Sequence, residues 1–92
     1  MARLTEDEIR ERLGRLEGWE RSSESITKSF DNGDFRGSVD FVNRVTPVAE
    51  GLNHHPDLEI SWSTVAVTLS THSEGGLTPR DFELAARIDE VA

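Results

Sequence analysis

The chain has 92 residues, a formal net charge of −8 and no cysteine, which predicts one small domain over residues 1–92 without disulfides or thiol chemistry. The negative charge disfavours phosphate backbones, and no apolar run is long enough for a signal peptide or a membrane span, so we expect a cytoplasmic protein with no nucleic acid and no membrane as partner. A core this small is often supplemented by oligomerisation.

The first expected element is an amphipathic helix over residues 4–18. Thr5 and Glu8 have the spacing of a capping box, in which each side chain accepts the backbone N–H of the other residue. Gly18 is the expected end of this helix. Three apolar residues share the face that would pack on the domain: Ile9, Leu13 and Leu16.

Two strands are expected next, a short one at residues 19–21 and a longer one that ends at Phe30. The polar residues 22–24 would form the turn between them. Side chains alternate along the longer strand, so one of its faces would carry Ile26, Lys28 and Phe30.

A long helix is expected over residues 34–53, where the Asp34 side chain can accept a free backbone N–H of the first turn and Asn53 suits the C-terminal end. Pro47 removes one helical hydrogen bond and crowds the preceding turn, so we expect a kink or a break there. Apolar residues form two stripes, which predicts burial on more than one side. The stripes are Phe35, Val39, Val42 and Ala49, and Phe41, Val45, Val48 and Leu52.

The last third of the chain predicts a hairpin followed by a helix. Residues 58–62 and 65–69 alternate apolar and polar side chains around a tight turn at residues 63–64. The pair at residues 75–76 is Gly-Gly and marks a loop, and Thr-Pro with a following Asp at residues 78–81 is a strong helix start. The buried face of the first strand of the hairpin would carry Leu58, Ile60 and Trp62.

The order of elements is therefore helix, two strands, helix, two strands, helix. Strand pairs joined by short turns give an antiparallel sheet. The sequence predicts an α+β domain of two layers, with a four-stranded antiparallel sheet and three helices packed on one face. The other face of the sheet, or an edge strand, is then open to self-association.

The three histidines are the residues best suited to chemistry. His54 and His55 follow the end of the long helix and precede Pro56, and His72 follows the hairpin. Loops meet regular structure at both places, so we expect the rings to lie on the rim of the domain and to add little to its core. Pro56 biases His55 toward an extended conformation. The residues alone are no more consistent with a shared histidine site than with a simpler interpretation. In that interpretation the histidines are polar surface residues and the pair beside Pro56 ends the helix.

A zinc site with three imidazole ligands is an alternative that the histidines leave open. Adjacent residues of an extended segment point to opposite sides, so His54 and His55 would converge only in a turn. No His-x-His, His-x-x-x-His or Glu-x-x-His spacing is present. We therefore favour a site without metal. Three acidic residues flank the histidines and would favour the imidazolium form if they lay close in space: Glu50, Asp57 and Glu74.

Residues 49–57, which read Ala-Glu-Gly-Leu-Asn-His-His-Pro-Asp, resemble the signature of the pterin-4a-carbinolamine dehydratase family. The resemblance continues through Trp62, residues 67–72, residues 76–78 and the Arg-Asp pair at residues 80–81. It is close over residues 49–92 and looser before them. The combination of His-His-Pro with a downstream Thr-His at this spacing is specific for the family, whereas either motif alone would be a weak signal. Two departures are Asn53, where animal members have an acidic residue, and Leu58, which replaces a frequent aromatic.

The resemblance implies the α+β fold and a homodimer or homotetramer. It also implies an enzyme, a hydro-lyase that dehydrates 4a-hydroxytetrahydropterin (4a-hydroxytetrahydrobiopterin) and so recycles the pterin cofactor of aromatic amino acid hydroxylases. The catalytic residues that it implies are His54, His55 and His72. The substrate-binding residues that it implies are His54, His55, Pro56, Thr71, His72, Ser73 and Glu74.

The chemistry of this reaction suits histidine. Elimination of water needs an acid for the leaving hydroxyl and a base for the proton on N5, and imidazole serves as either near neutral pH. No redox change occurs, so we expect neither cofactor nor metal. His54 and His72 would lead the proton transfers, and His55 would bind the substrate or support one of them. The alternative function is a non-catalytic binding or assembly factor on the same fold, which would be expected to have lost the histidines.

Overall fold

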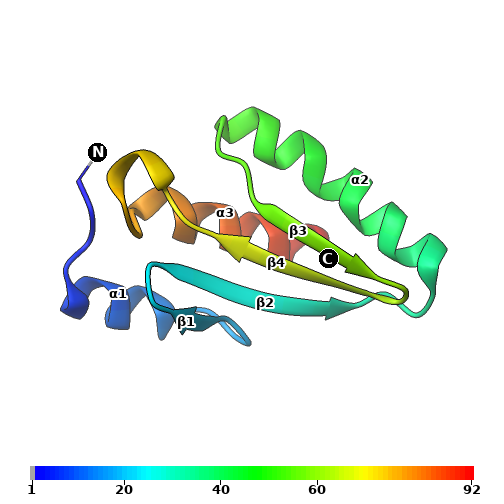
Figure 1. The fold of residues 1–92 in the computed structure, drawn as a ribbon, viewed down its shortest axis with the longest axis horizontal. Coiled ribbons are helices and arrows are strands. Elements are labelled where there is room, and N and C mark those ends of the chain that lie inside the picture. The colour runs from blue at the N-terminus through cyan, green and yellow to red at the C-terminus, as the bar shows by residue number, and fades with distance from the viewer. Residues whose placement is uncertain (1) are drawn as a thin grey trace.

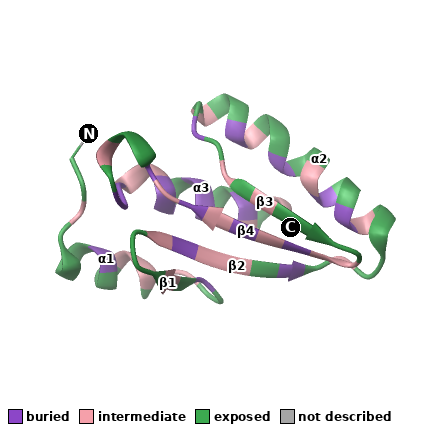
Figure 2. Ribbon diagram, viewed as in Figure 1, coloured by how far each residue is buried: buried purple, intermediate pink, exposed green. Residues whose placement is uncertain are grey.

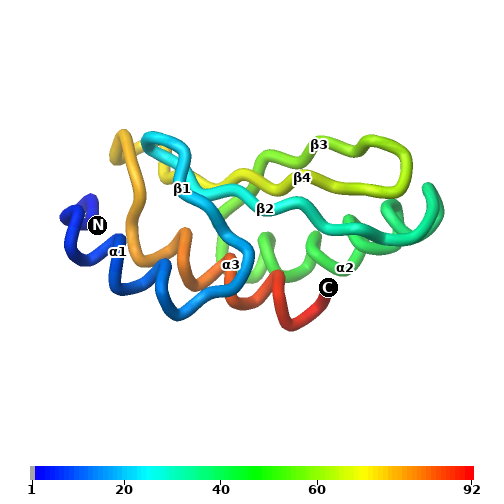
Figure 3. The backbone as a smooth tube through the Cα atoms, turned by 90° about the horizontal axis from the view of Figure 1, so that it is seen from below, coloured from blue at the N-terminus to red at the C-terminus, as the bar shows by residue number. Residues whose placement is uncertain are grey.

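The structure is a computed structural model that describes residues 2–92. Its elements, in chain order, are α1 (Glu6–Leu13), β1 (Glu20–Ser22), β2 (Ser25–Asp31), α2 (Phe35–Leu52), β3 (Asp57–Ser61), β4 (Thr64–Leu69), a short 3₁₀ turn (His72–Glu74) and α3 (Pro79–Val91). The strands form one antiparallel sheet in the order β1-β2-β4-β3 (Figure 1). All three helices lie on one face of this sheet (Figure 3), so the predicted α+β architecture is confirmed.

Buried residues occur on the strands β2 and β4 and on the helices α2 and α3 (Figure 2), and they form one core cluster. Along β4, buried side chains alternate with half-buried ones, as expected for a strand with one covered face. Each fully buried aliphatic or aromatic side chain stabilises the fold by about 1.5–3 kcal/mol. The central strands and the two longer helices supply most of these residues: Ile26, Val65, Val67 and Leu69 from the sheet, and Phe41, Val45, Leu84 and Ile88 from the helices.

The capping box at the start of α1 is present. The Thr5 hydroxyl accepts the backbone N–H of Glu8 at 3.2 Å, and the Glu8 carboxylate accepts the backbone N–H of Thr5 at 2.8 Å. That second hydrogen bond lowers the pKa of Glu8. The helix ends at Leu13, so the expected end at Gly18 is wrong. Gly18 instead has φ +79 and turns the chain into β1, where a positive φ favours glycine.

The kink or break predicted for α2 at Pro47 is not a break, because the helix runs without interruption from Phe35 to Leu52. A kink there stays a prediction. Pro47 lies on the exposed side of the helix, where water can reach the carbonyl that loses its partner. In the preceding turn the Thr46 hydroxyl donates to the carbonyl of Val42 at 2.8 Å. Even α2 is not apolar enough to cross a membrane, and neither is any other helix within residues 2–92.

The expected burial of both apolar stripes of α2 is correct only in part, because Phe41, Val45 and Ala49 are buried but two residues of the first stripe are not. Phe35 is 56 % exposed and Val39 is 37 % exposed, because nothing in the two-layer fold covers the outer side of this helix. Trp62 was predicted to lie in the first strand of the hairpin, and this prediction is wrong. Ser61 pairs with Thr64, which leaves Trp62 in the turn between β3 and β4, where it is 72 % exposed.

Candidate active site

The end of α2 turns His54 toward α3. Asn53 adopts the left-handed conformation and ends the helix, and the backbone N–H of His54 donates to the carbonyl of Ala49 at 3.1 Å. The histidine is only 8 % exposed, and its Nε2 lies 2.6 Å from Oδ1 of Asp81 in the first turn of α3. The expectation that His54 lies on the rim and adds little to the core is therefore wrong.

Asp81 is the centre of a buried hydrogen-bond network. Its Oδ2 accepts the Thr71 hydroxyl at 2.8 Å and the backbone N–H of Thr78 at 3.0 Å. Since the single hydroxyl proton of Thr71 goes to Asp81, the Thr78 hydroxyl donates to Thr71 Oγ1, 2.8 Å away. A fully buried carboxylate is costly unless its oxygens are satisfied, and here both are. The network thus ties His54 to the segment that leads into His72.

His55 differs from its neighbour His54 in environment, because His55 is exposed and His54 is buried. Its Nε2 contacts the Glu50 carboxylate of the last turn of α2, and both side chains are exposed. Beside them lies a small cavity of about 180 Å³. Its walls are mostly apolar and include His55, Pro56 and Leu58 together with Val45 and Ala49.

His72 stands at the start of the 3₁₀ turn that follows β4. Its Nε2 lies 3.9 Å from a carboxylate oxygen of Asp57, the residue that follows the His-His-Pro sequence. The fold therefore brings the two histidine-bearing segments to the same end of the sheet (Figure 1). Ser73 and Glu74 belong to the same turn, where Ser73 is exposed and Glu74 is half-buried.

Arg80 supports the segment that carries His54 and His55. Its Nη2 donates to the carbonyl of Leu52 at 2.8 Å and to that of Asn53 at 3.1 Å. The last carbonyls of a helix have no partner within the helix and carry partial negative charge, so a guanidinium there is favourable. The first turn of α3 thus holds both the backbone before His54 and the ring of His54.

Two important partners were not predicted from the sequence as part of the site. Asp81 and Arg80 were interpreted only as the beginning of the last helix and as part of the family resemblance. The sequence signal for Asp81 was its place in the helix start. That signal does not show that Asp81 contacts His54, because the two residues are 27 positions apart. Glu50 and Asp57 were expected to matter if they lay close to histidines, and each does.

The arrangement of the histidines and carboxylates also bears on the zinc alternative. Within residues 2–92, no group of three His, Cys, Asp or Glu side chains is arranged to hold a metal ion. The carboxylates near the histidines are instead paired one to one with them, which is an arrangement suited to orienting the rings.

Known proteins resemble this chain over nearly its whole length. A provisionally named pterin-4-alpha-carbinolamine dehydratase of Roseiflexus castenholzii is 49 % identical, with 98 % of this chain and 97 % of the relative covered. One of the same provisional name in Sulfolobus acidocaldarius is 45 % identical, with 97 % and 98 % covered.

Solved structures agree with these sequence matches. A crystal structure described as a transcriptional coactivator/pterin dehydratase from Brucella melitensis has a TM-score of 0.93 at 40 % identity and covers 98 % of both chains. A pterin dehydratase-like protein identified as a RuBisCO assembly factor of the alpha-carboxysome has a TM-score of 0.66 at 21 % identity, which shows a shared fold alone. The sequence model described as pterin 4 alpha carbinolamine dehydratase matches residues 2–91. The chain therefore belongs to the pterin-4a-carbinolamine dehydratase family.

Proposed function

We propose that the chain dehydrates 4a-hydroxytetrahydropterin, in the form of 4a-hydroxytetrahydrobiopterin, to the quinonoid dihydropterin. The reaction would return the pterin cofactor of aromatic amino acid hydroxylases to use. The observation that carries the proposal is the presence of three histidines, each beside a carboxylate, in a chain of this family. The pterin is the substrate in this proposal, and no cofactor is needed.

The reaction breaks the C4a–O and N5–H bonds, forms a C4a=N5 double bond and releases water. An acid must protonate the leaving hydroxyl, and a base must accept the proton from N5. General acid–base catalysis of this kind contributes about 10²–10⁴-fold to a rate. The proposal assigns these two tasks to His54 and His72.

His54 suits the role of base in its neutral form. The Asp81 carboxylate accepts a hydrogen bond, so it favours the tautomer with the proton on Nε2 and the lone pair on Nδ1. His72 suits the role of acid, because its exposed ring can regain a proton from water and its Nε2 has Asp57 nearby. His55, with Glu50 beside it, would bind the substrate.

The family resemblance also implies substrate contacts at Pro56, Thr71, Ser73 and Glu74. Pro56 lies at the apolar cavity beside His55 and can contact one face of a flat ring. The Thr71 hydroxyl is already engaged by Asp81 and Thr78, so we assign Thr71 the task of holding the loop. The turn that contains Ser73 and Glu74 would offer polar groups to the pterin edge.

A direct assay tests the proposed function. Chemically made 4a-hydroxytetrahydropterin is mixed with the protein in a stopped-flow instrument, and absorbance follows the loss of the 4a-hydroxy compound. The proposal expects a rate well above the spontaneous dehydration in buffer. A rate equal to that of buffer would contradict it and favour the alternative, a non-catalytic binding or assembly factor on this fold.

Activity is expected without a metal. The protein is dialysed against a strong chelator and then assayed by the same dehydration reaction. Because acid–base chemistry on a pterin needs no Lewis acid, turnover should stay within the error of the untreated sample. A loss of activity that zinc restores would contradict the acid–base mechanism and favour three imidazole ligands.

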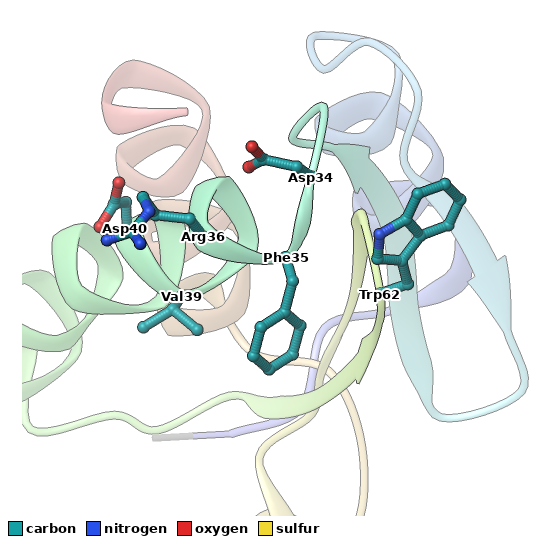
Figure 4. A pocket seen from close by; sticks show the side chains of 6 residues that line it. All are labelled: Asp34, Phe35, Arg36, Val39, Asp40 and Trp62. Atoms are coloured by element: carbon teal, nitrogen blue, oxygen red, sulfur yellow. The ribbon is translucent and has the colours of Figure 1, made fainter.

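We also propose that the chain forms a homodimer or homotetramer. The surface that supports this lies at the outer side of α2 and beside the edge strand β3, and we call it the Trp62 surface. Its exposed apolar residues are Phe35, Val39, Ile60 and Trp62. Figure 4 shows Phe35 between Val39 and Trp62, around a hollow of about 580 Å³. An antiparallel edge strand can pair with its own copy about a two-fold axis, so a second chain is the partner that fits.

The backbone of Trp62 adds to this argument. Its φ of +51 is unfavourable for a bulky residue, and the Ser38 hydroxyl holds the turn through a 2.8 Å hydrogen bond to the Trp62 carbonyl. A strained and exposed tryptophan does not stabilise the isolated chain. It would contribute strongly to the free energy of association if a partner covered it, because buried aromatic residues dominate interface energies.

Replacing Trp62 with glycine is therefore expected to shift the protein toward monomer. Light scattering at micromolar concentration should report two or four chains for the unchanged protein and one chain for Trp62→Gly. Ser23→Gly is a matched control, since Ser23 is also exposed with φ +56 but lies in the β1–β2 turn. A monomeric unchanged protein would contradict the proposed oligomer, and an oligomeric Trp62→Gly protein would contradict the proposed surface.

A further inference from the structure

The loop between β4 and α3 carries His72, yet little of it is packed. None of the three residues of its 3₁₀ turn, His72–Glu74, is buried. The loop is closed at its base by two backbone hydrogen bonds, from Thr71 N–H to the Gly76 carbonyl at 3.1 Å and from Gly76 N–H to the Thr71 carbonyl at 3.4 Å. These bonds fix the shape of the loop, but its position on the domain must come from other contacts.

One of those contacts is the hydrogen bond from the Thr71 hydroxyl to Asp81. Others come from the other end of the chain. At the entrance to the loop, the Ser70 hydroxyl donates to the carbonyl of Glu24 in the β1–β2 turn at 2.8 Å. At the exit, the backbone N–H of Leu4 donates to the carbonyl of Leu77 at 2.8 Å. Arg3 adds a longer contact, with Nη1 at 3.5 Å from the Gly75 carbonyl. Both ends of the loop are thus held by residues from the first 24 positions of the sequence.

The packing at Gly76 shows how closely these parts meet. A Cβ atom at this position would lie 2.6 Å from Oε2 of Glu24 and 2.8 Å from Cδ of Arg3. Both distances are shorter than any normal contact, so the absence of a side chain at Gly76 lets the two side chains close over the base of the loop. The N-terminal arm, defined as residues 2–4, therefore fits the loop and is not only adjacent to it.

We infer that the N-terminal arm and the β1–β2 turn clamp the loop of residues 71–76 in its substrate-binding position. Leu4, through its backbone N–H, and Ser70, through its hydroxyl, are positioning residues for His72. The inference rests on the proposed function, because only that proposal gives the loop its substrate. It adds a task for the N-terminal arm, which holds none of the residues that bind or react with the pterin.

Two pairs of variants test the clamp. Leu4→Pro removes the N–H at this position, whereas Leu4→Ala removes only the apolar side chain and keeps the N–H. Ser70→Ala removes the second hydrogen bond, and Ser29→Ala is its control on the exposed part of β2. Hydrogen exchange of the amides of residues 72–75 measures the loop, and dehydration kinetics measure its consequence.

The clamp predicts that Leu4→Pro and Ser70→Ala each raise loop exchange by about threefold to tenfold, the effect of one lost hydrogen bond. KM for the pterin should rise by a similar factor, and the controls should show neither change. A variant that only destabilised the whole domain would lower kcat through a smaller folded fraction and leave KM unchanged. Far-ultraviolet circular dichroism and urea unfolding report that folded fraction.

Unchanged loop exchange in both clamp variants would overturn the inference. So would faster exchange with an unchanged KM, because the loop would then move without affecting the substrate. Absence of dehydration by the unchanged protein would instead contradict the proposed function. In that case the exchange measurement still decides whether the arm holds the loop.

Discussion

Asp81→Asn is expected to fold and to lose at least about 100-fold in kcat, within the range of general acid–base catalysis. The asparagine amide has the size of the carboxylate, and its oxygen can still accept the Thr78 N–H. Its NH₂ group, however, can only donate to Nε2 of His54. The ring must then carry its proton on Nδ1, and the proposed base is lost.

Asp81→Ala provides the comparison that separates position from folding. It leaves His54, Thr71 and Thr78 buried without an acceptor, and each buried donor left unsatisfied costs about 1–3 kcal/mol. Together these costs are a large part of the roughly 5–15 kcal/mol that stabilises a small domain. Urea unfolding should show a much lower midpoint for Asp81→Ala than for Asp81→Asn.

The outcome for Asp81→Asn decides the role of this residue. Stopped-flow dehydration gives kcat and KM, and circular dichroism checks the fold. A folded Asp81→Asn protein that turns over at the normal rate would show that the tautomer of His54 is unimportant. Glu83→Gln is a suitable control, because Glu83 lies exposed on the same helix and has only a 3.7 Å contact with Arg87.

The fold could be predicted because its signals are local. The Thr5–Glu8 capping box, the Asp34 cap and the alternation along β4 each depend on residues a few positions apart, and each is present in the structure. Strand pairs with short turns then leave few ways to assemble four strands. The exact ends of elements were less predictable, since the residue that caps α1, Gly14, keeps a helical conformation with φ −65.

The errors arose where tertiary structure decides the outcome. Pro47 was expected to kink or break α2, and the break is absent, because the exposed side of the helix tolerates the missing hydrogen bond. Phe35 and Val39 have the spacing of a buried stripe and are exposed. Apolar periodicity shows which side chains share a face, and it does not show whether anything within the same chain covers that face.

The candidate site could be predicted only in part. The three histidines and their flanking acids are visible in the sequence, and the pairing of His72 with Asp57 follows from the meeting of two loops. The burial of His54 could not be foreseen, because it depends on the packing of α3 against the end of α2. That burial changes the experiment on the histidines, since His54→Ala now removes a partner from a buried carboxylate.

Replacing the histidines one at a time is expected to lower dehydration by different routes. His72→Ala should reduce kcat by at least about tenfold, since it removes a proposed proton donor and the exposed side chain adds little to folding. His55→Ala should raise KM more than it lowers kcat, because the proposed task of His55 is to bind the pterin. His54→Ala should reduce kcat by at least about tenfold and also lower the urea midpoint.

His54→Gln resolves that double effect. The glutamine amide can still donate a hydrogen bond to Asp81, so the buried carboxylate keeps a partner, but the amide cannot accept a proton near neutral pH. The kcat of His54→Gln should fall by at least about tenfold. Its urea midpoint should lie closer to that of the unchanged protein than the midpoint of His54→Ala does. In the double variant His54→Gln, His72→Ala, the losses should be less than the product of the single losses, because groups that act on one transition state behave as a unit. If this double variant is folded and dehydrates the pterin at the normal rate, histidine acid–base catalysis is not the mechanism of this protein.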